Sequence, residues 1–403
     1  MRPFTSTISL DEARRRLDAT VHPIKRIERV PLEHAAGRVA AANVSSPIDV
    51  PPFARSAMDG YAVMAADTAR ATAASPVGLR VIERVYTGQV PHRTVVPGTC
   101  AEIATGAPIP CGADAVVMVE ETARSADDAV DILMPASAGQ NIGRRGADIV
   151  AGAAVIQAGD VLTPARIGAL AAVGGVDVEV FARPRVAILS TGNEVVEPGS
   201  GALAPGQIFD VNRFTLSAIV EAHGGVPEPG PPVGDSLDDL TRALDHAAEA
   251  DLVVFSGGSS VGERDLMLDV VEARGEMVFH GISIKPGKPT AFALVGGTPL
   301  FGMPGNPTSC LSNAYILLVP FLRAMARLPP FRPRVMRLPL GRRIDSPVNR
   351  HQIYTVRIAD GIAQPAFKGS GDITSLSRAD GYIEIPEEQS VVEEGTIVEV
   401  TIF

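Results

Sequence analysis

The sequence predicts a multidomain α/β protein, and three observations lead to this prediction. The chain has 403 residues, which allows two to four domains at roughly 100–200 residues per domain. Short apolar strands alternate with helices between 181 and 328, and this alternation is typical of a doubly wound, mostly parallel sheet. Short β-branched runs between Gly and Pro turns occupy 49–146 and 329–403, which favours two further domains of β structure.

Helix signals flank the first of these β segments. Ser9 and Glu12 have the spacing of a capping box at the start of a helix over 13–19. The segment 32–42 is a second helix candidate, and Thr163 before a proline marks the start of a third. The expected domains are a helical domain of 1–48 and 147–180, an inserted β domain of 49–146, an α/β domain of 181–328 and a small C-terminal β barrel of 329–403.

Within the α/β segment, apolar runs define the strands and capped runs define the helices. Expected strands cover 186–190, 252–256, 277–280, 291–295 and 300–302, and expected helices cover 214–223, 236–250, 266–273 and 308–325. In the C-terminal segment, nine Arg and one acid lie between 323 and 357, whereas seven acids and no base lie between 380 and 399. We expect these two stretches to face each other or solvent.

The composition excludes several classes of partner. The net charge of −10 argues against non-specific binding to DNA or to an anionic membrane. Aromatic residues make up 4% of the chain and Trp is absent, so a base-stacking nucleic-acid binder is not expected. The three cysteines form no CxxC pair and the N-terminal residues contain no apolar signal segment. We therefore expect a reduced, cytoplasmic protein without a zinc site.

Three Gly-rich loops follow strands of the α/β segment. They are 191–194, 256–265 and 303–307. The carboxyl ends of parallel strands lie on one edge of a sheet, where ligands bind, so we expect these loops to line one crevice. Backbone N–H groups in such loops and at helix N-termini favour an anionic ligand.

Charged residues accompany these loops and two others, 234–236 and 285–289. The carboxylates are Glu194, Asp235 and Asp265, and the cations are Lys285 and Lys288. Mg²⁺ commonly binds one or two carboxylates together with substrate phosphates, and lysines bind phosphate or another oxyanion as point charges. The set predicts a metal-assisted site for a phosphorylated small molecule, although Glu194, Asp235 or Ser236 alone would more simply be a helix cap.

Other catalytic patterns are not supported. The segment 258–262 has the form G-x-S-x-G of a serine hydrolase elbow. The histidines that follow it, His280 and His351, lie in a strand and in another domain, so a catalytic triad is not expected. Gly281 and the later Gly-Lys pair lack the spacing of a phosphate-binding P-loop, and no G-x-G-x-x-G follows a strand.

Several long motifs occur in the order typical of one family. They are PPFARSAMDGYA at 51–62, IATGAPIP at 103–110, GQNIGRRGADI at 139–149, STGNEV at 190–195, VGDS at 233–236, SGGSSVGERD at 256–265, KPGKP at 285–289, GMPGNP at 302–307 and GSGDITSLSRADGY at 369–382. With these motifs the chain resembles the MoeA and gephyrin E-domain family of molybdopterin molybdenumtransferases over essentially its whole length. Ser259 stands where the family motif has Val, a small departure that affects no expected role.

The resemblance implies an elongated homodimer in which 1–48 and 147–180 form the dimerisation domain and 181–328 binds molybdopterin. It implies that molybdenum from molybdate is inserted into the dithiolene of adenylated molybdopterin, with Mg²⁺-dependent hydrolysis that releases AMP, in molybdenum cofactor biosynthesis. It also implies an adenylyltransferase and molybdoenzymes as partners. Because the metal-binding sulfurs belong to the substrate, this chemistry requires no catalytic Cys.

The resemblance also implies roles for residues in several segments. Asp59, Thr105 and Glu194 look like catalytic residues, and Asp59 and Thr105 are expected to face the crevice of the partner subunit. Glu194, Asp235 and Asp265 look like metal ligands. The expected substrate-binding residues are Asp235, Ser256, Gly257, Gly258, Lys285, Lys288, Pro304, Pro307, Arg144 and Ser375, with Arg145 and Asp148 in support.

Three other functions stay open on the sequence. The first is a molybdopterin adenylyltransferase, because related single-domain α/β proteins make the adenylate from ATP. The second is a non-catalytic scaffold of the gephyrin type. The third is a tungsten-specific relative, because molybdate and tungstate are oxyanions of nearly the same size.

Overall fold

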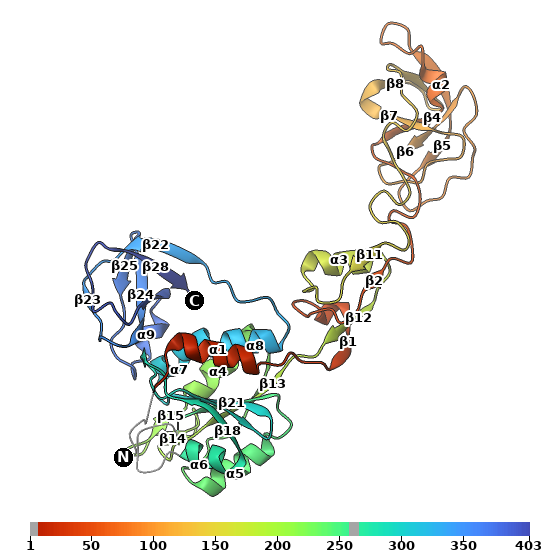
Figure 1. Cartoon of the computed structure of the whole chain (residues 1–403). Helices are drawn as coiled ribbons and strands as arrows, with labels where there is room; N and C mark the ends of the chain where they lie inside the picture. The colour runs from red at the N-terminus through yellow and green to blue at the C-terminus, as the bar shows by residue number, and fades with distance from the viewer. Residues whose placement is uncertain (1–6, 258–265) are drawn as a thin grey trace. The chain divides into compact units, whose positions relative to one another are not determined.

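A computed structural model describes residues 7–257 and 266–403 (Figure 1). The chain divides into two compact units. The first unit comprises 1–28, 37–39 and 179–403, and the second comprises 29–36 and 40–178. Each unit contains a six-stranded sheet and its own hydrophobic core.

A six-stranded sheet forms the centre of the first unit. Its strands, in spatial order, are β16 (Val226–Pro229), β13 (Arg185–Ser190), β17 (Leu252–Ser256), β21 (Thr298–Met303), β20 (Ala291–Val295) and β18 (Gly275–His280). The first four strands are parallel, and β20 is antiparallel to both of its neighbours. This edge is antiparallel because β20 and β21 form a hairpin, whose turn glycines Gly296 and Gly297 have φ of +58° and +87°. The predicted strands and their mostly parallel order are confirmed.

Helices cover both faces of this sheet, as the predicted doubly wound fold requires (Figure 1). Successive side chains of a strand point to opposite faces, so Val186 and Ile188 of β13 join one core while Ala187 and Leu189 join the other. The first core includes α1 (Leu10–Thr20), α4 (Asn212–Ala222), α7 (Pro307–Asn313) and α8 (Val319–Met325), and the second includes α5 (Leu237–His246) and α6 (Leu266–Arg274).

Helix α1 begins where the sequence predicts. The Ser9 hydroxyl accepts a hydrogen bond from the Glu12 N–H at 3.2 Å, while the Glu12 carboxylate pairs with two arginines of the same helix. Leu10 and Leu17 are buried in the first core, together with strands that follow much later in the chain. The helix is therefore part of the first unit.

The helix predicted over 32–42 is wrong. A single 3₁₀ turn, Leu32–His34, is followed by a turn in which Gly37 has φ of +72°. A left-handed residue cannot continue a right-handed helix, so the helix does not form. The third predicted helix is confirmed as α3 (Pro164–Ala172), whose N-cap Thr163 accepts a hydrogen bond from the Arg166 N–H.

The helix predicted over 308–325 is continuous but contains a π-helical turn. The turn Ala314–Leu318 lies between α7 and α8. Pro320 lies just after it, and a proline inside an α-helix lacks an N–H and clashes with the carbonyl four residues earlier. A wider turn before the proline relieves this clash.

The C-terminal strands of the first unit form a closed sheet. In spatial order they are β22 (Val335–Pro339), β28 (Ile397–Ile402), β26 (Gly381–Ile385), β24 (His351–Ala359) and β25 (Ile362–Pro365). A bridge between Leu340 and Ala363 joins β22 to β25 and closes the ring, as a small barrel requires. Arg343 pairs with Asp345 and Glu393, so the basic and acidic stretches face each other at this point.

The barrel is tied directly to the α/β part. The short strand β19 (Ile284–Lys285) belongs to the α/β segment in sequence, yet it pairs in parallel with β24 of the barrel. Further bonds connect the two parts: the Thr308 N–H donates to the Ser370 carbonyl at 3.1 Å, and the Thr308 hydroxyl donates to the Asp372 carbonyl at 2.7 Å. The barrel and the α/β part therefore form one unit.

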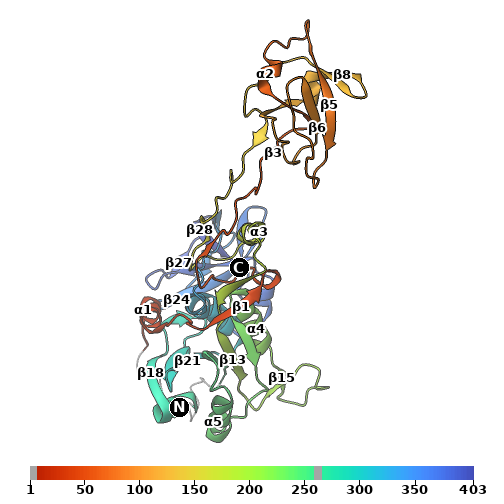
Figure 2. The ribbon, with the colours of Figure 1, turned by 90° about the vertical axis from the view of Figure 1, so that its right-hand side faces the viewer.

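A second six-stranded sheet forms most of the second unit (orange in Figures 1 and 2). In spatial order its strands are β7 (Ala115–Met118), β4 (Gly60–Val63), β6 (Thr99–Ile103), β5 (Val77–Val85), β9 (Ala129–Ile132) and β8 (Thr122–Ala126). Tyr61 and Val63 of β4 join one core and Ala62 joins another, so both faces are covered. The β structure predicted for 49–146 is confirmed.

Short elements complete the chain. They are β1 (Ile27–Pro31), β2 (Val44–Ser45), β3 (Arg55–Ser56), α2 (Ala65–Thr68), a 3₁₀ turn (Val119–Glu121), β10 (Ile142–Gly143), β11 (Ala154–Ile156), β12 (Asp177–Phe181), β14 (Val195–Val196), β15 (Ile208–Phe209), β23 (Ile344–Asp345), α9 (Thr374–Ser377) and β27 (Val391–Val392). Among residues 7–257 and 266–403, no helix is long and apolar enough to cross a lipid bilayer.

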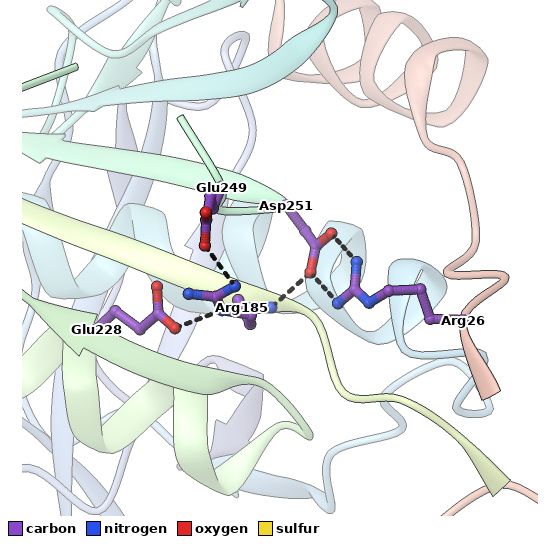
Figure 3. Close-up of polar contacts among 5 residues, drawn as sticks. All are labelled: Arg26, Arg185, Glu228, Glu249 and Asp251. Carbon is purple, nitrogen blue, oxygen red and sulfur yellow. Dashed lines mark hydrogen bonds and ion pairs between the residues drawn. The ribbon is translucent and has the colours of Figure 1, made fainter. Parts of the chain in front are cut away.

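A charged network anchors the segment that follows α1 to the sheet (Figure 3). Arg26 makes two hydrogen bonds to the Asp251 carboxylate, at 2.5 and 2.7 Å, and the Arg185 N–H donates to the same carboxylate at 2.8 Å. The Arg185 side chain pairs with Glu228 and Glu249. Burial alone would raise the pKa of Asp251, but the bonds from Arg26 and Arg185 outweigh it and hold that pKa below its ordinary value.

We expect Asp251→Asn to destabilise the protein by about 1 to 3 kcal/mol at neutral pH, the usual range for a hydrogen bond to a charged group. Because the folded-state pKa of Asp251 is lowered, its stabilisation is complete above the ordinary Asp pKa of about 3.9 and is lost as the pH falls through the folded-state value. Urea unfolding of both proteins between pH 7 and pH 3 measures this difference.

The control is Asp245→Asn, which removes an exposed partner of Arg274. An exposed ion pair contributes about 0–1 kcal/mol, so this variant should stay close to the wild type. Equal losses of unfolding free energy in the two variants would contradict the role given to the network. So would a difference in unfolding free energy between the wild type and Asp251→Asn that does not become smaller in acid.

Candidate functional site

A cavity of about 920 Å³ lies at the carboxyl edge of the first unit's sheet. It is lined by the loops that follow β13, β17 and β21, by the segment around β15 and α4, and by the barrel. The lining residues are Ser190, Thr191, Gly192, Glu194, Val195, Leu203, Ile208, Phe209, Asp210, Val211, Asn212, Asp235, Ser256, Gly257, Pro289, Pro304, Gly305, Asn306, Pro307, Gly371 and Ile373. The predicted convergence of the three loops is therefore confirmed for 191–194, 256–257 and 304–307, whereas 258–265 of the second loop lie outside the described residues.

Close backbone contacts hold these loops together. The Thr191 N–H donates to the Ser256 carbonyl at 2.9 Å, and the Gly257 N–H donates to the Met303 carbonyl at 3.1 Å. Gly257 has φ of +96°, and a Cβ at this position would lie 2.4 Å from the Thr191 carbonyl oxygen. Only glycine fits here, which explains the Gly in the second loop.

Two of the predicted carboxylates, Glu194 and Asp235, line the cavity and are exposed. Asp235 accepts a hydrogen bond from the Asn193 N–H at 3.1 Å, and its own N–H donates to the Asn193 side-chain oxygen at 3.3 Å. These bonds fix the Asp235 loop against the Glu194 loop. The N-cap of α5 is Ser236, whose hydroxyl accepts from the Asp239 N–H, so Asp235 is not the helix cap.

The third carboxylate, Asp265, and the predicted substrate residue Gly258 lie outside the described residues. Within the described ranges, no group of three His, Cys, Asp or Glu side chains could hold a metal ion. Glu194 and Asp235 are ligands of the type that Mg²⁺ takes, since this cation commonly binds one or two carboxylates and completes its shell with water and substrate phosphate.

The predicted lysines lie on a turn that reaches the cavity through Pro289. Lys285 is held by the pairing of β19 with β24, and the Lys288 carbonyl accepts a hydrogen bond from the Ile282 N–H at 2.9 Å. Both lysine side chains are half-buried. The turn is therefore held at both lysines, but Pro289 is its residue in the cavity wall, and neither Lys285 nor Lys288 is among the lining residues.

The other predicted residues of the first unit divide into two groups. Ser256, Gly257, Pro304 and Pro307 line the cavity. Ser375 is fully buried, and its hydroxyl accepts a hydrogen bond from the Lys368 N–H at 3.0 Å. Ser375 therefore supports the neighbouring barrel segment 369–373, whose residues Gly371 and Ile373 line the cavity.

Sequence analysis missed two polar residues of the wall, Asp210 and Asn212. Asp210, just before the N-cap Val211, accepts a hydrogen bond at 3.1 Å from the Arg213 N–H in the first turn of α4, and Asn212 donates to the Gly305 carbonyl at 2.8 Å. The Asn212 side-chain oxygen is buried without a hydrogen-bond partner in the described part of the chain, which typically costs about 1–3 kcal/mol. The second Asp210 oxygen lies 3.8 Å from the Arg213 Nε, within ion-pair distance. The signal was an Asp-x-Asn before a predicted helix, which is also ordinary capping chemistry.

In the second unit, Asp59 and Thr105 are brought together. The Asp59 carboxylate accepts hydrogen bonds from the Thr105 N–H at 2.7 Å and from the Thr105 hydroxyl at 2.9 Å. Both bonds lower the pKa of Asp59, and the bond from the Thr105 backbone N–H has the larger effect. Asp59 is therefore an exposed, ionised acceptor on a fixed turn.

The predicted substrate-binding residue Arg144 and the two predicted supporting residues lie elsewhere in the second unit. Arg144 and Asp148 are exposed, and the Asp148 N–H donates to the Val50 carbonyl at 3.0 Å. Arg145 pairs with Asp49 at 2.6 Å. The pairing fixes the two strands of chain that lead into and out of the β domain.

Buried thiols contribute no nucleophile. Burial raises the pKa of Cys100 to about 12 and also raises that of Cys310. A thiol with a raised pKa stays protonated near neutral pH and reacts poorly.

The fold and the cavity define a class of protein. Loops at the carboxyl edge of a parallel sheet enclose a cavity with two exposed carboxylates on its wall, so this is an α/β protein with a ligand-binding cavity at the sheet edge where such proteins bind small molecules. Family models match three consecutive parts of the chain: the MoeA N-terminal region (domain I and II) at 8–174, a probable molybdopterin binding domain at 187–324 and the MoeA C-terminal region (domain IV) at 337–403. The chain belongs to the MoeA family, whose enzymes act in molybdenum cofactor biosynthesis.

Relatives and solved structures agree with this assignment. Molybdopterin molybdenumtransferase 2 of Mycobacterium tuberculosis is 36% identical over 92% of this chain and 94% of its own length. Molybdopterin molybdenumtransferase of Haemophilus influenzae is 33% identical over 98% of both chains. A molybdopterin biosynthesis MoeA protein from Pyrococcus horikoshii superposes with a TM-score of 0.84 at 40% identity, over 98% of this chain and 99% of its own.

We expect Gly257→Ala to destabilise the protein more than Gly199→Ala. Both residues have positive φ, at +96° and +88°, so both substitutions carry a left-handed strain of about 1–2 kcal/mol. Only Gly257 also has a backbone oxygen where the new Cβ would be, whereas Gly199 has open space. Urea unfolding measures the free energy of unfolding of both variants. Equal losses of this free energy would contradict the close approach of the loops at Gly257.

Proposed function

We propose that this protein transfers molybdenum from molybdate to the dithiolene sulfurs of adenylated molybdopterin. The phosphoanhydride bond of the adenylate is hydrolysed in the same process, so water adds to phosphorus and AMP leaves. The observation that carries the proposal is the cavity of about 920 Å³ with two exposed carboxylates on its wall. This volume lies at the upper end of the range for small-molecule sites, as a ligand of pterin plus nucleotide size requires.

The charged groups around the cavity match the parts of this substrate. Glu194 and Asp235 would hold Mg²⁺, which supplies positive charge to the phosphates when bound. Lys285 and Lys288 would bind molybdate or a phosphate as point charges. With these charges fixed before substrate arrives, little reorganisation is needed in the transition state.

The wall formed by Pro304, Pro307 and Ser256 has no charge of its own. It would bound the substrate beside the charged loops and exclude bulk water from that side. Asp265 and Gly258, which lie outside the described residues, are proposed as further metal and substrate ligands on the strength of the family motif alone.

We expect Glu194→Gln and Asp235→Asn each to lower kcat by about 10²-fold or more, because each removes a fixed charge from the site. AMP release and active cofactor are measured with adenylated molybdopterin, molybdate and Mg²⁺. Glu221→Gln is the matched control, since it removes one exposed carboxylate of α4 without touching the cavity.

The same assay separates the alternative functions. Consumption of ATP with free molybdopterin would favour an adenylyltransferase, and partner binding without AMP release would favour a scaffold. Competition between molybdate and tungstate identifies the preferred oxyanion. Wild-type rates in both carboxylate variants would contradict the assignment of the site.

We further propose a cytoplasmic homodimer in which Asp59 and Thr105 act on the reaction of the partner subunit. The four expected domains, including dimerisation by 1–48 and 147–180, belong to this proposal. Its support is the family motif around each residue and the exposed, ionised state of Asp59. The adenylyltransferase and the molybdoenzymes are proposed as partners that supply the substrate and receive the product.

Mixed dimers test the assignment to the partner subunit. Asp59→Ala and Glu194→Ala homodimers should both be inactive, whereas a dimer with one copy of each should retain about half of the wild-type activity, because one of its two sites keeps both residues. The two variants are co-expressed with different tags and the mixed dimer is purified through both. No activity in the mixed dimer would show that both residues must come from one chain.

A further inference from the structure

A buried asparagine contacts the lysine turn beside the cavity. Asn313 is the last residue of α7 and is 0% exposed. Its Nδ2 donates a hydrogen bond to the Gly287 carbonyl oxygen at 3.0 Å and another to the Thr290 hydroxyl. The Thr290 hydroxyl in turn donates to the same Gly287 carbonyl at 2.9 Å. One carbonyl of the turn is therefore held by two buried side chains.

The chemistry of its neighbours fixes which end of the Asn313 amide faces the turn. If the amide were reversed, its oxygen would face the Gly287 carbonyl, and two acceptors would repel each other. Gly287 also approaches closely: it has φ of +102°, and a Cβ at this position would lie 2.2 Å from the Asn313 Nδ2. The turn thus rests directly on the amide group.

The Gly287 carbonyl belongs to the peptide that precedes Lys288. The Thr290 N–H also bonds to this carbonyl, at 3.2 Å, and the Lys288 carbonyl accepts from the Ile282 N–H at 2.9 Å. The next residue, Pro289, is part of the cavity wall. A shift of the Gly287 carbonyl would therefore move Lys288 relative to the cavity.

Packing alone does not explain an asparagine at this position. The Asn313 side-chain oxygen has no hydrogen-bond partner in the described part of the chain, and a buried polar atom without a partner is unfavourable. An apolar side chain would have no polar atom of its own to leave buried without a partner. What the amide adds is its pair of donated hydrogen bonds.

We propose that Asn313 is a positioning residue for the oxyanion: it places Lys288 without touching the bound ligand. The proposal deepens the proposed function and rests on it, because it takes Lys288 as a ligand of molybdate. It predicts that loss of the amide weakens the use of molybdate and leaves the use of the pterin substrate unchanged.

The first variant is Asn313→Leu. An N–H···O bond of 3.0 Å is shorter than the contact of a methyl group with oxygen, so Leu displaces the Gly287 carbonyl. We expect the KM for molybdate to rise about tenfold, as for other small misplacements of a site. The kcat and the KM for adenylated molybdopterin should keep their wild-type values. The control, Ser312→Ala, removes a buried hydroxyl of the same helix that has no hydrogen-bond partner among the described residues.

A double-mutant cycle shows whether Asn313 acts through Lys288. In the Lys288→Ala background, Asn313→Leu should cause no further loss of molybdate affinity, because the group that it positions is gone. If the two effects multiply, Asn313 acts elsewhere and the proposal is overturned. A rise of both KM values, or of neither, overturns it as well.

Two measurements keep the test independent of folding and of the proposed function. If Asn313→Leu does not fold, Thr290→Val removes the other side-chain donor to Gly287 and should give the same molybdate-specific loss; an unchanged molybdate KM would then overturn the proposal. Calorimetric titration with molybdate reports affinity without turnover. A wild type that releases no AMP contradicts the proposed function, whereas a wild type and an Asn313→Leu protein with equal molybdate affinity contradict only the role of Asn313.

Discussion

Three parallel strands end in register at one edge of the first unit's sheet, and the site depends on this alignment. Ser190 is paired with Ser256, and Ser256 with Met303. The strands β13, β17 and β21 therefore end at the same level of the sheet, and their loops begin side by side. Hydrogen bonds past the strand ends keep the loops together, from Thr191 to Ser256 and from Gly257 to Met303. Glu194 reaches the cavity because it follows β13, and Asp235 reaches it from the loop after β16, which is parallel to β13.

Much of this arrangement could be predicted from the sequence, because its causes are local. The strands are continuous apolar runs, which a sheet buried on both faces requires. The loops contain Gly and Pro at the positions where backbones approach closely, as at Gly257. The rule that parallel strands end on one edge then brings Glu194 and Asp235 to the cavity without any knowledge of long-range contacts.

The parts that could not be predicted depend on contacts between distant segments. Asp210 and Asn212 look like capping residues in the sequence, and only the position of Gly305 shows that Asn212 also supports the cavity wall. The barrel reaches the cavity through Gly371 and Ile373, although the motif drew attention to Ser375. The prediction of a helix over 32–42 is wrong because helix propensities do not show that Gly37 adopts a left-handed turn.

The first unit is built from both ends of the chain, and this determines the order in which the protein folds during synthesis. Helix α1 has 11 residues, a length at which an isolated helix is marginal in water. Its apolar face packs against strands that start at Arg185, and the whole second unit lies between them in sequence. On the ribosome the second unit is complete before the first strand of that sheet exists, so the earliest segment to emerge is among the last to reach its native contacts.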